Sequence, residues 1–131
     1  MKIKQTTFYA LRAIRRIYLA DETIVTSTMI AEKEDISQGV LIRILRMLDK
    51  ADILKAHQGR GAVSGGFSLN KDIKNITMLD ILELLEGVDI SINLDAETRE
   101  RDKLLYDQIS NINHNISEEL EKYTICDLFE L

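Results

Sequence analysis

Apolar residues in the first fifty positions recur at spacings of three and four, which is the period of one helix face. This pattern predicts three helices, over residues 6–20, 27–34 and 37–49. The first and third have the clearest apolar stripes, made of Phe8, Leu11, Ile14 and Tyr18 and of Leu41, Ile44, Leu45 and Leu48. Hydroxyl side chains that can cap a helix stand at the start of the second and third helices: Thr26 or Ser27 for the second and Ser37 for the third.

The pattern changes over residues 53–69. Ile53 to His57 and Phe67 to Leu69 are short strand candidates, and four of the six glycines lie between them. Because glycine accepts positive φ angles, this loop predicts a β-hairpin. Helical spacing returns over residues 77–86, where apolar residues occur nearly all round, so this helix should be buried and should end at Gly87.

A long helix is predicted over residues 96–123, with a narrow apolar stripe among charged neighbours. The stripe consists of Leu105, Ile109, Ile112, Ile116, Leu120 and Tyr123. A narrow stripe on a long helix is typical of a coiled-coil-like seam. An internal seam is the alternative, but few other elements remain to cover it, so we expect it to join two copies of the chain. The apolar tail, residues 125–131, is expected to dock on another part of the protein.

Composition narrows the class of protein. A length of 131 residues suits one domain, and 45% apolar residues supply a core. The single cysteine, Cys126, excludes a disulfide scaffold. No apolar run approaches the roughly 18 residues of a membrane span, and the first residues lack an apolar signal core, so we expect a cytoplasmic protein without a membrane partner.

Charge divides the chain into two unlike parts. Residues 1–60 carry eleven Lys and Arg against seven Asp and Glu, whereas residues 61–131 carry six against fifteen. The net charge is therefore +4 in the first part and −9 in the second, within a total of −5. Such asymmetry suggests a basic working face in the first part, and chance surface composition is the alternative.

Three helices followed by a glycine-bearing hairpin is the order of a winged helix-turn-helix, in which the third helix enters the DNA major groove. The expected fold is mainly α with one β-hairpin and a long C-terminal dimerisation helix. The candidate DNA contacts are Ser37, Gln38, Gly39, Arg43, Arg46, Lys50, Gly59, Arg60 and Gly61. An ordinary solvated face is the alternative for the cations of the third helix. Arg12, Arg15 and Arg16 either support the DNA backbone or pair with acids.

Several segments, in this order and spacing, resemble the Rrf2 family of bacterial winged-helix transcription regulators over about residues 2–90. They are FYALRA at 8–13, IAE at 30–32, LIRIL at 41–45, KADILK at 50–55, GGFSL at 65–69, ITMLDI at 76–81 and LEG at 85–87. The resemblance implies a homodimer paired through a long C-terminal helix, which agrees with the seam at residues 105–123.

The chain departs from that family in two places. Many members hold an iron–sulfur cluster through three cysteines after the Leu-Glu-Gly segment, whereas residues 88–106 of this chain contain no cysteine. In the first helix, Phe8 stands near the position at which some members have an acidic cluster ligand. Carboxylates such as Asp89 and Asp95 do not replace thiolates around iron–sulfur. We therefore expect no cofactor and no metal. Residues 62–64 lengthen the wing, which places its tip contacts in question.

The sequence thus predicts a DNA-binding transcription regulator, with repression as the expected action, that binds a pseudo-palindromic operator as a homodimer. Residues 1–87 would form the DNA-binding domain and residues 88–131 the dimerisation helix and tail, in one compact unit. The alternative is a protein-interaction module that kept the fold and lost DNA binding. No nucleophile–base constellation supports an enzyme. A small molecule, a partner protein or oxidation of Cys126 would supply the signal, although an inert thiol is the simpler interpretation. His57 and His114 are expected to be ordinary strand and surface residues.

Overall fold

The computed structural model describes residues 2–20, 23–59, 65–87 and 96–131. Its first part is the predicted set of three helices, α1 (Gln5–Leu19), α2 (Ser27–Glu34) and α3 (Gln38–Lys50). Apolar residues of α1 and α3 fill the core between them, including Ile14, Leu41, Ile44 and Leu45, each at most 1% exposed. The predicted stripe of α3 is buried throughout, whereas in the predicted stripe of α1 only Leu11 and Ile14 are buried, and Phe8 and Tyr18 are 50% and 46% exposed.

The predicted hairpin consists of β1 (Leu54–His57) and β2 (Gly66–Leu69), which pair antiparallel with Leu54 opposite Leu69 and His57 opposite Gly66. Val25, just before α2, adds an isolated bridge to Phe67 through two backbone hydrogen bonds of 2.8 Å. A side chain on Gly66 would collide with the carbonyl of Val25, so glycine is required where the hairpin closes on this segment.

The helix predicted over residues 77–86 is α4 (Met78–Glu86), preceded by a short 3-10 helix η1 (Ile73–Asn75) that the periodicity did not predict. Thr77 and Asp80 form a capping box at its start, and Gly87 ends it with a φ of 59°. Leu79, Ile81 and Leu82 are buried, whereas Leu84 and Leu85 are half-buried, so α4 is covered on most of its circumference but not on all of it.

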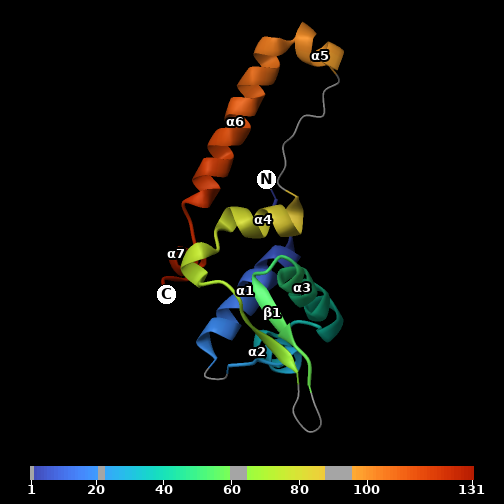
Figure 1. Cartoon of the computed structure of the whole chain (residues 1–131), viewed down its shortest axis with the longest axis vertical. Helices are drawn as coiled ribbons and strands as arrows, with labels where there is room; N and C mark the ends of the chain where they lie inside the picture. The colour runs from blue at the N-terminus through green and yellow to red at the C-terminus, as the bar shows by residue number, and fades with distance from the viewer. Residues whose placement is uncertain (1, 21–22, 60–64, 88–95) are drawn as a thin grey trace.

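The long helix predicted over residues 96–123 is interrupted. It comprises α5 (Ala96–Arg101) and α6 (Lys103–Glu121), separated by Asp102 with φ −119° and ψ 47°, outside the helical region. Aspartate favours such helix-start positions because its side chain competes with the helical backbone. Figure 1 shows α6 projecting from the body that contains α1 to α4, with α5 at its far end and the hairpin at the opposite end of the molecule.

The tail docks as expected, through α7 (Ile125–Phe129). Thr124 and Asp127 form a second capping box, and Thr124 faces Thr77 in an isolated bridge. Backbone hydrogen bonds from Met78 to Tyr123 (2.8 Å) and from Ile125 to Ile76 (2.9 Å) tie the starts of α4 and α7 together. Ile125 is fully buried, so the end of α6 is fixed to the winged-helix core.

Candidate nucleic-acid interface

The outward face of α3 is where the candidate DNA contacts gather. Its inward stripe is buried, whereas the candidate residues of this segment are all exposed: Ser37, Gln38, Gly39, Arg43, Arg46 and Lys50. Adding a Cβ to Gly39 would meet no atom within 4 Å, so the start of the helix is open to an approaching surface. The structure thus places small and polar groups at the N-terminus of α3 and cations further along the same face.

Two residues at the start of α3 differ from what the sequence predicts. Ser37 occupies the position before the helix, but its side chain makes no capping hydrogen bond among the described residues. Instead of serving the helix, its hydroxyl lies on the exposed face. The amide of Gln38 donates a hydrogen bond of 2.7 Å to the hydroxyl of Ser27 on α2. The sequence pattern did not predict this contact of Ser27. The pair Thr26 and Ser27 could have indicated it, because only one of the two hydroxyl groups is needed to cap α2.

The wing is held at a defined position beside α3. The carboxylate of Asp49, near the end of α3, accepts a hydrogen bond of 3.0 Å from the backbone N–H of Ala56 in β1. Within the hairpin, His57 Nε2 and the Ser68 hydroxyl lie 2.7 Å apart. Gly59 is exposed beyond β1, and the predicted tip contacts Arg60 and Gly61 lie outside the described residues. The base of the wing is therefore held by these hydrogen bonds next to the exposed face of α3.

Between α2, α3 and the wing lies an open hollow of about 420 Å³. It is lined by Thr26, Ser27, Thr28, Ile42, Ala56, His57, Gly65, Gly66 and Phe67. Three hydroxyl groups and the imidazole of His57 lie in it beside apolar side chains, with no carboxylate among these residues. Such a lining suits phosphate and sugar groups of a nucleic-acid backbone.

The arginines of α1 pair with an acid instead of facing outward. Arg12, Arg15 and Arg16 lie 3.5, 3.5 and 3.1 Å from the carboxylate of Glu34 on α2. The Glu34 side chain is only 4% exposed, and the guanidinium of Arg12 also donates to its backbone carbonyl. Of the two interpretations of these arginines, pairing with acids is the one the structure supports. These ion pairs join α1 to α2, the first helix of the helix-turn-helix.

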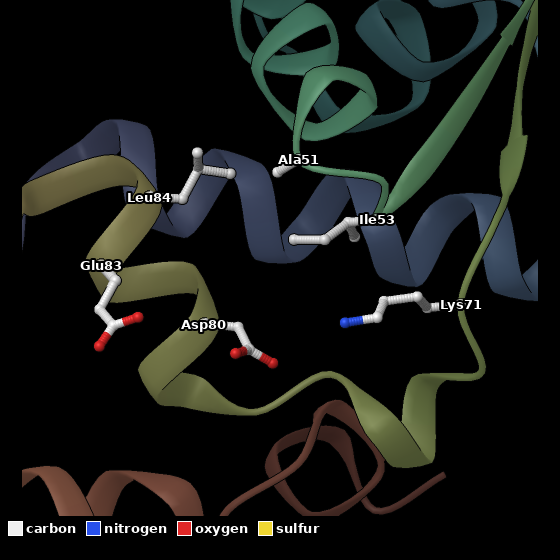
Figure 2. A pocket seen from close by; sticks show the side chains of 6 residues that line it. All are labelled: Ala51, Ile53, Lys71, Asp80, Glu83 and Leu84. Atoms are coloured by element: carbon white, nitrogen blue, oxygen red, sulfur yellow. The ribbon is translucent and has the colours of Figure 1, made fainter.

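A second hollow, of about 300 Å³, lies beside α4 and has different chemistry. Figure 2 shows Lys71, on the segment after β2, extending toward α4, on which Asp80 and Glu83 lie, with Ile53, just before β1, pointing into the same space. Asp80 is already engaged in the capping box of α4. This mixed and partly acidic surface would repel a polyanion, so the face of α3 is the better candidate for nucleic acid.

Except for Tyr123, which follows the end of this helix, the stripe predicted as a dimer seam lies on α6, which contains no buried residue. Leu105 and Ile112 are each 57% exposed, whereas Ile109, Ile116 and Leu120 are half-buried. Cys126 is half-buried in α7, and His114 lies on the surface, 3.0 Å from Glu118. Among the described residues, no helix is both long and apolar enough to cross a membrane.

A helix-turn-helix followed by a two-stranded wing, with an exposed basic third helix, defines a winged-helix DNA-binding regulator. The chain belongs to the Rrf2 family, described as iron-dependent transcriptional regulators, which matches residues 3–131. The resemblance noted over residues 2–90 therefore extends to nearly the whole chain.

Three relatives illustrate the match. The chain is 26% identical to BadM of Rhodopseudomonas palustris, named as an HTH-type transcriptional regulator, over 132 aligned residues that cover all of this chain and 83% of BadM. It superposes on CymR, the global cysteine regulator of B. subtilis, with a TM-score of 0.68, 27% identity and coverage of 98% and 95% of the two chains. It also superposes on a transcriptional regulator from Listeria innocua, with a TM-score of 0.67, 28% identity and coverage of 99% of this chain and 87% of that one.

The family description names iron, and the donor set of this chain does not fit an iron–sulfur cluster. Such clusters are held by several cysteine thiolates, and the chain has one cysteine, placed in α7 and packed against the core. Within the described ranges, no group of three or more His, Cys, Asp or Glu side chains is arranged to hold a metal ion.

Proposed function

We propose that the chain is a cytoplasmic transcriptional repressor that binds a pseudo-palindromic DNA operator as a homodimer, without an iron–sulfur cluster. The observation that supports this most is the exposed basic face of α3 beside a fixed wing. Arg43 and Arg46 supply cations, and Ser37 and Gln38 supply hydrogen-bonding groups close to base edges. A dimer that covers an operator blocks access of other proteins to the same DNA, so repression is the outcome we propose.

The proposed dimer rests on α6. The helix α6 has 19 residues, none of them buried, and three of its apolar residues are more than half exposed: Leu104, Leu105 and Ile112. Such a helix leaves apolar surface uncovered in a single protomer. Pairing α6 with a second copy covers this stripe and places two copies of α3 on one DNA duplex. In this arrangement residues 1–87 read DNA, and residues 88–131 provide the dimer contact and the connection to the core.

Arg43 and Arg46 should respond differently to replacement by alanine. Arg43 lies nearer the start of α3, so its loss should cost about 1–3 kcal/mol of binding and relax preference at one position of each half-site. Arg46, almost one turn further on, is assigned to phosphate, so its loss should weaken all sequences alike and lower the salt dependence by about one unit per contact. Gel shifts at several salt concentrations measure both effects.

Lys74→Ala is the matched control, because Lys74 is an exposed cation in η1, away from α3. It should leave binding unchanged. If Arg43→Ala and Arg46→Ala also bind a selected operator like the unchanged protein, the assigned face is wrong. The net charge of −9 in residues 61–131 favours the second candidate, an interaction module without DNA binding, and failure of the unchanged protein to shift DNA from its own upstream region would support it.

Protein purified without oxygen should contain no iron–sulfur cluster. Even a dimer offers only two thiols, both from Cys126, which is fewer than the protein ligands these clusters normally take. Colour, iron and acid-labile sulfide are measured together, and Cys126→Ser serves as the comparison. A brown preparation with stoichiometric iron and sulfide, lost in Cys126→Ser, would contradict this part of the proposal.

A further inference from the structure

Ser27 on α2 and Gln38 on α3 connect the two helices of the helix-turn-helix on its exposed side. The Gln38 amide nitrogen donates to the Ser27 hydroxyl at 2.7 Å. Gln38 is the first residue of α3, so its side chain lies at the end of the helix that would be closest to base edges. The contact therefore involves a group assigned to DNA reading and a group on another element.

Ser27 is not needed to cap its own helix. The N-cap of α2 is Thr26, whose hydroxyl accepts a hydrogen bond of 3.2 Å from the backbone N–H of Met29. Ser27 is instead the first residue of α2, and among the described residues its side-chain hydrogen bond is the one with Gln38. The hydroxyl of Ser27 is thus free to act on Gln38.

The contact determines which groups Gln38 presents. A glutamine amide has two N–H donors and one carbonyl oxygen. With one N–H held by Ser27, the amide plane is oriented, and one N–H and the carbonyl oxygen remain. One donor and one acceptor side by side are the groups that pair with N7 and the N6 amino group of adenine in the major groove.

We propose that Ser27 is a positioning residue for base recognition: it orients the Gln38 amide so that each protomer selects adenine at one position of its half-site. This inference rests on the DNA-binding function proposed above. Without Ser27, the amide rotates freely and presents its donor and acceptor in either order, so several bases are tolerated. Loss of Ser27 should therefore lower discrimination more than overall affinity.

The location of Ser27 strengthens the expected effect. Ser27 lines the hollow between α2, α3 and the wing, where a DNA duplex on the face of α3 would displace water. In the free protein the Ser27–Gln38 hydrogen bond is exposed and competes with water. In the complex that competition is reduced, so the hydrogen bond matters most when the base is read.

The test is selection of bound sequences from a library of random duplex DNA, followed by sequencing. It compares the unchanged protein with Ser27→Ala, Ser27→Thr, Gln38→Ala and the double variant. The position read by Gln38 is the one whose adenine preference Gln38→Ala removes. At that position Ser27→Ala should reduce the preference about three- to tenfold, the range expected for loss of one hydrogen bond. Ser27→Thr, which keeps a hydroxyl, should restore it.

Adding Ser27→Ala to Gln38→Ala should have no further effect at that position, since the two act as a unit. Glu32→Ala, at an exposed position of the same helix outside the hollow that Ser27 lines, is the matched control and should select like the unchanged protein. A Ser27→Ala pattern identical to that of the unchanged protein would overturn the inference while leaving the DNA-binding proposal intact. So would a Gln38→Ala variant with unaltered preferences. A wild-type chain that enriches no sequence would overturn both.

Discussion

Replacing Leu105 and Ile112 together by glutamate should convert dimers into monomers. Both side chains are 57% exposed in the protomer, so the substitutions leave its core intact. In a dimer joined through α6 they would place four carboxylates in an apolar seam, where burying an unpaired charge is prohibitive. Sedimentation at micromolar concentration measures the change in mass directly.

The same double variant should lose DNA affinity by about 100-fold or more, because a monomer cannot engage two half-sites at once. Ser110→Glu with Asn111→Glu is the matched control, since it adds the same charge at exposed positions of α6 away from the stripe. This control should remain dimeric. An unchanged protein that sediments as a monomer, or a dimer that survives the Leu105 and Ile112 substitutions, would refute the assignment of α6.

Replacing Glu34 by alanine should destabilise the protein by about 3 kcal/mol, the low end of the cost of breaking a buried ion pair. The substitution removes the one carboxylate that three arginines of α1 approach, and leaves their charges close together. The cost stays at the low end because the arginine side chains are about one-third exposed and still reach water. The melting temperature should fall by about 10 °C.

Glu32→Ala is the control, because Glu32 is an exposed carboxylate on the same helix. Its effect should stay within about 0.5 kcal/mol. Thermal and urea unfolding are compared at one protomer concentration, since dimer stability depends on concentration. A Glu34→Ala protein that melts within 2 °C of Glu32→Ala would show that the arginine cluster does not hold α1 against α2.

The elements predicted well are those whose determinants are local. The stripe through Leu41, Ile44, Leu45 and Leu48 predicts both the helix and its buried face, and all four residues are buried in α3. Thr77 and Gly87 mark the start and end of α4 because capping depends on neighbouring backbone. The glycine-rich hairpin is likewise a local feature, and Gly66 is required by close approach to Val25.

The features that were missed depend on contacts distant in sequence or on a single residue. Nothing local distinguishes an arginine that pairs with Glu34 from one that faces solvent, because packing of α1 on α2 brings them together. The break at Asp102 interrupts a charged segment in which helical spacing alone predicts continuity. Within the seam stripe Ile112 is exposed and Ile116 is half-buried, and α6 packs against α4, a contact between elements that helical spacing does not predict.

In the candidate site, the exposure of the cations of α3 follows from the helical period. The contacts that α3 makes with α2 and with the wing do not follow from it. The period places Arg43 and Arg46 opposite the buried stripe, and both are exposed in the structure. The contact of Gln38 with Ser27 required the turn between α2 and α3 to be known. The contact of Asp49 with Ala56, which fixes the wing, likewise depends on the angle between α3 and β1.

The most direct test of the central claim is the set of duplexes that the unchanged protein selects from a random library. The account predicts one enriched sequence made of two inverted half-sites, with centres about one helical turn (~34 Å) or a multiple of it apart, so that both copies of α3 enter major grooves on one side of the DNA. Selection of duplexes with no shared sequence, or of a single half-site without its inverted repeat, would contradict it.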